Sequence, residues 1–268
     1  MRIVMYPARD KPKSRHLCRA LSAGCPGSLV SEGARLDESA DLHVLYGVTA
    51  HTAKLFHQLR DNPGQDYLYL DNGYFGRGEY YRVTLNSLQH DGTGNAKPDR
   101  FHKFGIPILP WRKTGDKIIL TAQSELWYSL LFHEERHKWI YSTQELIRVW
   151  SHREIVLRMK PDPIPNHWVE EGFLTALQGQ WAVVTHSSNT AVEAILQGIP
   201  GFVTHPEAAP KTLGFHNLDN IENPPYPEGR EQWAWNLAAN QWTVEEMRNG
   251  TCWKGLCKNW EESMSLSA

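Results

Sequence analysis

Four consecutive residues with hydroxyl or amide side chains, at positions 187–190, follow the apolar run 182–184. Residues of these types cap the first turn of a helix, and Gly198 and Pro200 mark where that helix ends. The pattern predicts a buried strand, a turn, a helix and a second strand. A helix start leaves backbone N–H groups unpaired at the positive end of the helix dipole, where phosphate groups bind. The segment therefore predicts an anion site at the carboxyl edge of a sheet.

The same segment, residues 181–204, resembles the donor-site element of GT-B glycosyltransferases, especially capsule-type (Kdo-transferase-like) and phage-encoded ones. In those families a strand ends in Thr-His/Asn-Ser-Ser and precedes a helix with an internal Glu and then Gly-x-Pro. The resemblance implies that the chain transfers a sugar from a nucleotide-sugar donor, expected to be UDP-linked, to a hydroxyl group. It assigns donor binding to five residues of the segment: His186, Ser187, Ser188, Asn189 and Glu193.

Two further cations, Arg158 and Lys160, close an expected strand at 155–159. Capsule-type transferases carry a Lys/Arg-x-His-Pro-like signature there, and this chain departs from it because Lys160 stands where the His would fall. A guanidinium or an ammonium group can neutralise a pyrophosphate. We therefore expect Arg158 and Lys160 to contribute to donor binding, against the alternative that they are exposed charges at a strand end.

Asp71 directly follows the expected strand 67–70. A carboxylate at the carboxyl end of such a strand can take the proton of an acceptor hydroxyl, which direct (inverting) displacement of the sugar requires. Similar Asp-(Asn/His)-Gly-Tyr-Phe-x-Arg runs occur in phage-encoded glycosyltransferase-like proteins. Asp71 is therefore the expected general base; the alternative is an Asx turn with Asn72 and Gly73.

The charge is unevenly divided along the chain. The first 120 residues have a net charge of +5 and the remainder −7, for a total of −2. A basic half with aromatic residues favours an anionic acceptor such as DNA. The phage resemblance points to 5-hydroxymethylpyrimidines in phage DNA, and a capsule-type polysaccharide is the competing acceptor. We expect the aromatic residues Tyr74, Phe75, Tyr80, Tyr81 and Trp111 to be exposed on this half. The expected acceptor-binding residues are Tyr74, Arg77, Trp111 and Arg112.

A second class of function is suggested by His133-Glu134-Glu135-Arg136-His137, which matches H-E-x-x-H. On one helix the two histidines would share a face and could bind zinc, with Glu134 as general base of a hydrolase. The charged pair at 135–136 and the lack of a third ligand at a familiar spacing count against this reading, so the main prediction includes no metal. A third possibility is a nucleotide-sugar-binding protein without turnover.

The candidate site residues must be brought to the edges of sheets by the strands and helices that precede and follow them. Strands are expected at 2–6, 42–46, 67–70, 118–121, 155–159 and 182–184, and helices at 13–23, 50–60, 125–150 and 168–178. Alternating strands and helices predict an α/β fold with doubly wound sheets. The resemblance implies a GT-B-like arrangement of two small sheets facing a cleft, with C-terminal helices packing back. The expected segments are an acceptor-side half at 1–115, a donor half at 116–229 and C-terminal helices at 230–268.

Composition restricts the remaining classes. The chain has 268 residues, of which 41% are hydrophobic and 22% charged, as in a globular protein, and it has no 18-residue apolar run that would span a membrane. Its four cysteines form no C-x-x-C pair, so we expect free thiols and a cytoplasmic location. Neither G-x-G-x-x-G nor a Walker A sequence is present. We therefore expect no nicotinamide or ATP site, and no cofactor other than the nucleotide-sugar co-substrate.

Overall fold

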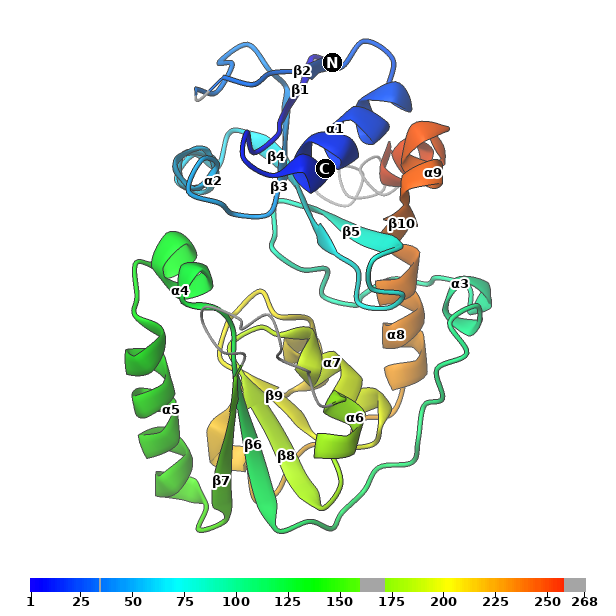
Figure 1. Cartoon of the computed structure of the whole chain (residues 1–268). Coiled ribbons are helices and arrows are strands. Elements are labelled where there is room, and N and C mark those ends of the chain that lie inside the picture. The colour runs from blue at the N-terminus through cyan, green and yellow to red at the C-terminus, as the bar shows by residue number, and fades with distance from the viewer. Residues whose placement is uncertain (34, 160–171, 258–268) are drawn as a thin grey trace. The chain divides into compact units, whose positions relative to one another are not determined.

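The computed structural model describes residues 1–33, 35–159 and 172–257, and the chain divides into two compact units (Figure 1). Unit 1 contains residues 1–87 together with the C-terminal residues from 240 onward, and unit 2 contains residues 88–239. The division differs from the boundary expected near residue 115, because residues 88–115 belong to unit 2. It also divides the expected C-terminal segment 230–268 between the two units.

Unit 1 is built on a six-stranded sheet in the order β10-β5-β4-β3-β1-β2. The pairings among β1 to β4 are parallel, whereas β5 pairs antiparallel with both β4 and β10. The strands are β1 (Ile3–Tyr6), β2 (Leu29–Val30), β3 (Leu42–Tyr46), β4 (Asp66–Asn72), β5 (Tyr80–Leu85) and β10 (Gln241–Thr243). Strand β1 therefore lies between its two successors, as in a doubly wound sheet.

Helices cover both faces of this sheet. Side chains alternate between the two faces along β4, so this strand contacts both helical layers. Leu68 and Leu70 pack in one core with α1 (Pro12–Ala23) and α9 (Val244–Arg248). Tyr67 and Tyr69 meet Phe56 of α2 (Ala53–Arg60) on the other face. The C-terminal strand β10, α9 and the helical residues 251–257 thus complete unit 1, which confirms that C-terminal helices pack back on the N-terminal sheet.

Unit 2 is built on a parallel four-stranded sheet in the order β7-β6-β8-β9. The strands are β6 (Lys117–Ala122), β7 (Glu154–Met159), β8 (Gln180–Thr185) and β9 (Gly201–Val203). From β6 the chain goes outward to β7 and then returns to the other side of β6 at β8. The strand order therefore reverses between β6 and β8, and α/β proteins bind ligands at the carboxyl ends of strands at such a switch point.

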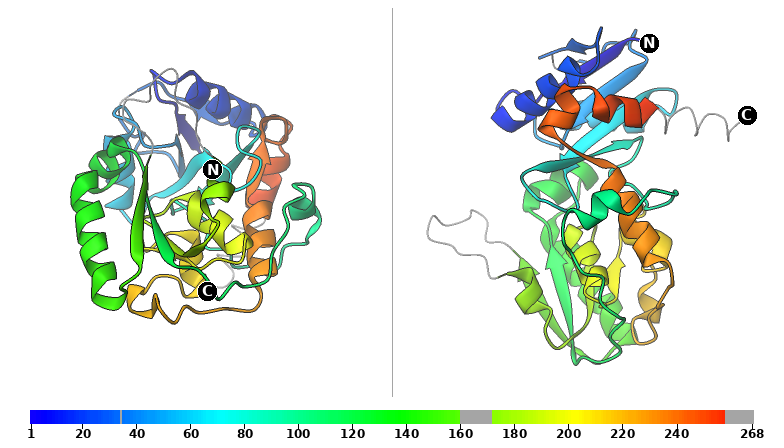
Figure 2. Two further views of the ribbon diagram at one scale, coloured as in Figure 1. Left: turned by 60° about the horizontal axis from the view of Figure 1, so that its bottom comes forward. Right: turned by 90° about the vertical axis from the view of Figure 1, so that its right-hand side faces the viewer.

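The helices of unit 2 lie on both faces of this sheet (Figures 1 and 2). Helix α5 contacts β6, and Ala194 of α7 packs with Ile119 and Val183 on the other face. The helices are α3 (Asp99–His102), α4 (Glu125–Phe132), α5 (Arg136–Trp150), α6 (Phe173–Ala176), α7 (Asn189–Leu196) and α8 (Arg230–Ala239), with short 3-10 turns at Ala209–Leu213 and Leu218–Asn220. Of the helix expected at 168–178, the part before residue 172 lies outside the described residues.

The helix expected over 125–150 is two helices. Helix α4 ends at Phe132, His133 adopts the left-handed conformation with φ of 52°, and Glu135 is extended before α5 begins at Arg136. The Glu125 side chain accepts a hydrogen bond from the Arg136 N–H at 3.2 Å, which fixes the start of the second helix. Because the chain breaks inside H-E-x-x-H, the expectation that its two histidines share a helix face is wrong.

Both sheets are doubly wound, so the α/β architecture expected from the sequence is confirmed. No helix within residues 1–33, 35–159 and 172–257 has the length and apolar character needed to cross a membrane. All four cysteines are in the described part of the chain, and none forms a disulfide, as expected.

Candidate functional site

The first candidate site is the switch-point turn, residues 186–190, at the carboxyl end of β8. Ser188 is the N-cap of α7, and its hydroxyl accepts a hydrogen bond from the Thr190 N–H at 3.3 Å. The Thr190 hydroxyl lies 2.8 Å from that of Thr121, and the Thr185 hydroxyl donates to the Thr121 carbonyl at 2.8 Å. These contacts join the turn to the ends of β6 and β8, so the start of α7 is held between the two strands that define the switch point.

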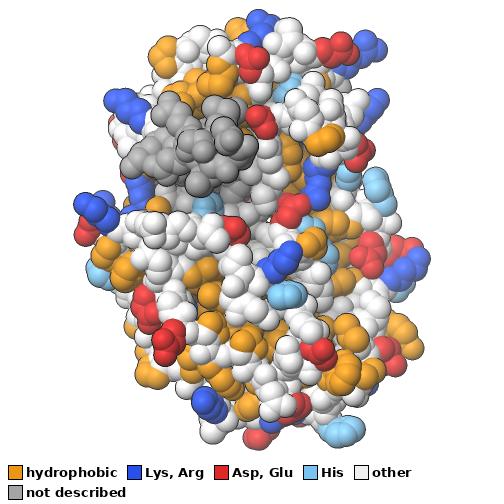
Figure 3. Space-filling view, turned by 180° about the vertical axis from the view of Figure 1, so that it is seen from behind, with side chains coloured by type: hydrophobic (Ala, Val, Ile, Leu, Met, Phe, Trp, Pro, Cys, Tyr) orange, Lys and Arg blue, Asp and Glu red, His pale blue; other side chains and the backbone are white. Residues whose placement is uncertain are grey.

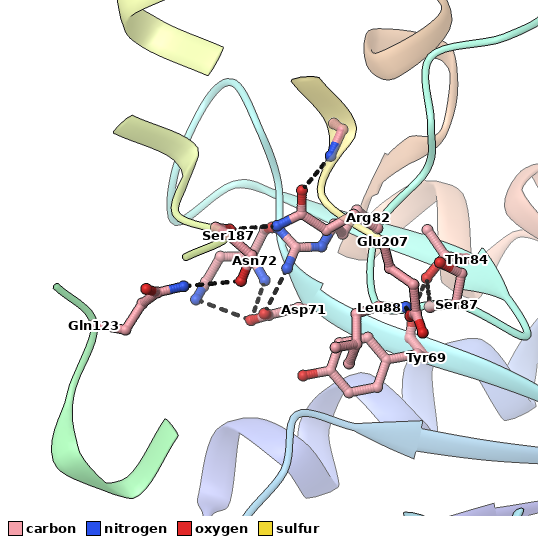
Figure 4. Close-up of polar contacts among 12 residues, drawn as sticks. Tyr69, Asp71, Asn72, Arg82, Thr84, Ser87, Leu88, Gln123, Ser187 and Glu207 are labelled. Carbon is pink, nitrogen blue, oxygen red and sulfur yellow. Dashed lines mark hydrogen bonds and ion pairs between the residues drawn. The ribbon is translucent and has the colours of Figure 1, made fainter. Parts of the chain in front are cut away.

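Gln123, just beyond β6, lies with its side-chain amide against this turn. Its Nε2 donates to the Ser187 hydroxyl at 2.9 Å, as Figure 4 shows, and the Gln89 side chain donates to the Ser187 carbonyl at 2.6 Å. With the Gln123 amide turned over, its oxygen instead accepts from the N–H groups of Ser187 and Ser188, both at 3.2 Å, and from the Trp127 indole at 3.3 Å. The second orientation satisfies more donors. One carbonyl oxygen then receives two consecutive backbone N–H groups.

The position of Gln123 bears on the chemistry of the turn. Two consecutive N–H groups that converge on one oxygen are the arrangement with which a turn before a helix binds a phosphate oxygen. Gln123 could not be predicted from local sequence patterns because it lies 64 residues before Ser187 in the chain. Its place directly after the strand that precedes the switch point is the one signal that could have found it.

His186 is buried in an aromatic cluster rather than exposed to a ligand. Its exposed fraction is 7%, and its ring centroid is 4.6 Å from that of Phe132 and 5.0 Å from that of His205. Tyr128 and Trp139 complete the cluster at 5.4 and 5.8 Å. Burial, followed by the neighbouring His205, lowers the pKa of His186 from 6.5 to about 3. The ring is therefore neutral at physiological pH and supports the turn by packing.

This pKa predicts a pH-dependent stability. An unfolded His186 takes up a proton below pH 6.5, whereas the folded ring stays neutral down to about pH 3, so its contribution is complete above pH 6.5 and is lost as the pH falls. We expect the free energy of unfolding to be roughly 2 kcal/mol lower at pH 5 than at pH 8 from this residue alone. Urea unfolding of wild type and His186→Phe at both pH values measures it, and an equal pH dependence in the two proteins would contradict it.

The other predicted donor residues lie at or near the same sheet edge where the structure describes them. Arg158 is opposite Thr121 in the register of β7 and β6, and its guanidinium lies 5.8 Å from the Phe173 ring. Asn189 and Glu193 are partly exposed residues of α7. Lys160 lies outside the described residues. The structure therefore brings Arg158 to the edge that carries the switch-point turn.

Trp111 and Arg112, predicted to bind an acceptor, have internal contacts in unit 2. The Arg112 guanidinium donates to the carbonyls of Leu177 and Gln180 at 2.7 and 2.8 Å, at the amino end of β8. The Trp111 indole donates to the Pro227 carbonyl at 3.2 Å, and the Arg230 guanidinium lies 4.0 Å from its ring. These contacts give both residues a packing role, and those of Arg112 lie at the opposite sheet edge from the switch-point turn.

The second candidate site is the carboxyl end of β4 in unit 1. Asp71 lies opposite Arg82 in the antiparallel register of β4 and β5, and the two form an ion pair at 2.8 Å (Figure 4). The other Asp71 oxygen accepts the Asn72 N–H at 2.7 Å. The side chain of Asp71 is 22% exposed, whereas that of Arg82 is 4% exposed. Asp71 is thus a fixed carboxylate that remains open to solvent, and Arg82 orients it.

Lys13 brings a positive charge to the same sheet edge. Its ammonium group donates to the Asn72 side chain at 2.7 Å and lies 4.7 Å from the centre of the Tyr81 ring and 5.9 Å from that of Tyr46. Desolvation, opposed by Asp71, lowers the pKa of Lys13. Lys13 was not among the predicted site residues, because its approach to Asn72 depends on where α1 begins.

The aromatic residues after Asp71 do not form an exposed stacking surface. Tyr74, Phe75 and Tyr81 are buried, and the Arg82 guanidinium lies 5.2 Å from the Tyr74 ring. The expectation that these three are exposed is wrong. The 73–79 loop folds back on the sheet, where the Gln241 side chain donates to the Phe75 carbonyl and accepts its N–H. Tyr81 lies in β5 and belongs to the core beside α1. Arg77 is exposed.

The residues of H-E-x-x-H do not assemble a metal site within the described ranges. His137 forms an exposed contact with Glu135 at 3.3 Å, and His133 is the C-cap of α4. No group of three or more His, Cys, Asp or Glu side chains among residues 1–33, 35–159 and 172–257 has an arrangement that could hold a metal ion. The broken helix removes the geometric basis of the zinc-hydrolase reading.

Comparisons with known proteins agree with the fold. No protein-family model and no curated protein sequence matches the chain. The solved structure of the beta Kdo 2,7 transferase of Thermosulfurimonas dismutans KpsC matches with a TM-score of 0.51 and 12% identity, covering 94% of this chain and 99% of that one. The beta Kdo 2,4 transferase of the same KpsC matches with a TM-score of 0.44 and 13% identity, covering 89% and 91%.

The likeness is one of fold. It confirms the GT-B-like α/β architecture that the sequence predicted.

Proposed function

We propose that the chain is a glycosyltransferase that uses a nucleotide-sugar donor. The observation that carries the proposal is the switch-point turn at the start of a capped helix, where the Ser187 and Ser188 N–H groups converge on the Gln123 side-chain oxygen when that amide is turned over. The GT-B-like fold supports the proposal. The GT-B glycosyltransferases that residues 181–204 resemble use nucleotide-sugar donors.

In this proposal, unit 2 holds the donor. The turn amides bind the phosphate oxygens, and Arg158 adds positive charge at the same sheet edge. When the bond between the sugar and the phosphate breaks, negative charge grows on the departing phosphate. Preorganised N–H groups stabilise that charge more than the ground state, which lowers the barrier. Glu193, one turn into α7, is assigned to the ribose hydroxyls.

Asp71 is proposed as the general base. The acceptor hydroxyl oxygen attacks the anomeric carbon while its proton passes to the Asp71 carboxylate, and the configuration inverts. The Arg82 pair supports this role by holding the carboxylate in one orientation, with 22% of the side chain exposed. Lys13 and the exposed Arg77 supply positive charge for an acidic acceptor.

We propose a glycan rather than DNA as the acceptor. The aromatic side chains that were expected to contact DNA include Tyr74, Phe75 and Tyr81, which are buried. Glycan acceptors need hydrogen-bonding groups and charges, and the edge around Asp71 provides these. Hydroxymethylated phage DNA stays a sequence-based prediction without this support.

The test is to incubate the purified chain with a panel of uridine and cytidine nucleotide sugars and two acceptor sets, acidic oligosaccharides and hydroxymethylated duplex DNA. Mass spectrometry should show the addition of one sugar to an oligosaccharide. Addition to DNA alone would overturn the acceptor assignment. Nucleotide binding without transfer or donor hydrolysis would favour a nucleotide-sugar-binding protein without turnover.

Gln123 occupies the position that the proposal gives to a phosphate oxygen, so a donor must displace it. We expect Gln123→Ala to bind a nucleoside diphosphate about three- to tenfold more tightly, because the competing oxygen is gone. The lost hydrogen bonds should lower the free energy of unfolding by about 1 kcal/mol. Isothermal titration calorimetry with UDP and urea unfolding measure the two effects. Weaker binding by the variant would show that Gln123 contacts the ligand instead.

A further inference from the structure

Exposed hydrophobic side chains are concentrated on one flank of unit 2. Within the described ranges, half of the large exposed hydrophobic side chains lie on α5 and β7, and these six define the α5–β7 flank: Tyr141, Leu146, Val149, Trp150, Leu157 and Met159. Tyr141 and Val149 are the most exposed of them, at 65% and 69%. In the view from behind, where α5 lies on the right, orange side chains interrupt the charged surface (Figure 3). Such a patch marks an interaction surface.

The flank also contains a sheet edge. β7 is an outer strand of the four-stranded sheet, and among the described strands of unit 2 it pairs with β6 alone. An outer strand presents backbone N–H and C=O groups that can pair with another strand. The flank therefore offers main-chain hydrogen bonds next to exposed apolar side chains.

The sequence of β7 is complementary to itself in antiparallel register. When two copies pair about Val156, Glu154 of one copy faces Arg158 of the other, on both sides of the centre. Ile155 then faces Leu157 on the opposite face of the strand. Cross-strand pairs of opposite charge and of β-branched or apolar side chains stabilise antiparallel pairing. Because β7 is complementary to itself in antiparallel pairing, a second copy of the same chain is favoured over an unrelated strand.

We propose that the chain forms a symmetric dimer through antiparallel pairing of β7 with β7 of a second copy, centred on Val156. The two four-stranded sheets join into one continuous sheet, and Leu157 of each copy packs against Ile155 of the other. A two-fold axis gives every contact twice, as an isologous interface requires. The present partner of Glu154, Lys117 at 2.8 Å, is itself exposed, so the carboxylate can face an arginine of the partner at little cost.

Sedimentation velocity of the full chain over a range of concentrations tests the proposal. Wild type is expected to show a monomer–dimer equilibrium. Glu154→Arg places arginine opposite arginine, and Arg158→Glu places carboxylate opposite carboxylate, so each should raise the dissociation constant at least tenfold. The double variant restores opposite charges and should return the dissociation constant to within about threefold of wild type.

The matched control is Glu245→Arg, which reverses one member of an exposed ion pair on α9 in unit 1 and should leave the dimer unchanged. Circular dichroism of each variant shows that it is folded. A wild-type protein that stays monomeric at all concentrations would overturn the proposal. So would a dimer that is indifferent to both single reversals, or one that the double variant fails to restore, since the interface would then lie elsewhere.

Discussion

Replacing Ser188 with Asp should abolish nucleotide binding without weakening the fold. Aspartate is as good an N-cap as serine, and its charge is favourable at the positive end of α7, so the stability of unit 2 should be unchanged or slightly higher. The same charge lies where the donor phosphate is proposed to bind. At about 4 Å, repulsion of about 4 kcal/mol at an effective dielectric constant near 20 corresponds to a loss of affinity of about 10³-fold.

Ser188→Asn is the matched control, because it keeps the cap without the charge and should retain binding within a few-fold. Calorimetric titration with UDP and thermal unfolding of the three proteins give the two readouts. A large loss of UDP affinity without a loss of stability distinguishes a phosphate site from a cap with a structural role only. Tight UDP binding by the Asp variant would place the phosphate elsewhere and overturn the proposed donor site.

Asp71→Asn should lower turnover about 10²- to 10⁴-fold, the usual contribution of a general base. The structure adds a second consequence. Arg82 is 4% exposed and loses its charged partner, and the loss of a hydrogen bond to a charged group in a half-buried pair costs about 1.5–3 kcal/mol. The variant is therefore expected to be less stable as well as inactive. Turnover must be measured per folded molecule, with unfolding followed by fluorescence of the same samples.

Asp71→Glu is the control for this experiment, because it keeps a carboxylate for Arg82. We expect it to be more stable than the Asn variant and to retain measurable turnover. Binding of UDP in unit 2 should be the same in both variants and in wild type. If turnover falls only in proportion to the folded fraction, Asp71 is a structural partner of Arg82 and the base lies elsewhere.

The sequence predicted the parts of the site that depend on local chemistry. The apolar run before residue 185 and the Ser188 cap indicate a strand and a helix start within a few residues, and both were found. The ion pair between Asp71 and Arg82 could not be predicted, because it depends on a hairpin register that places residue 71 opposite residue 82. The strand β5 itself was not predicted.

Two other predictions were wrong because contacts between residues distant in the sequence decide the structure. The helical periodicity of 125–150 continues through residues 133–135, but the left-handed His133 and the Arg136–Glu125 contact decide that the chain turns there. The burial of Tyr74 and Phe75 depends on Gln241, which is 166 residues beyond Phe75. Periodicity reports which side chains could face a core, whereas long-range contacts determine which of them do.

The chain enters unit 1, leaves it for residues 88–239 and returns at residue 240. During synthesis the sheet of unit 1 therefore cannot be completed until residues 241–243 emerge from the ribosome, because β5 lacks its outer neighbour until then. The inserted unit has all of its strands by then and can fold first. Shortening the chain before residue 240 should thus cause residues 1–87 to misfold, while residues 88–239 stay native.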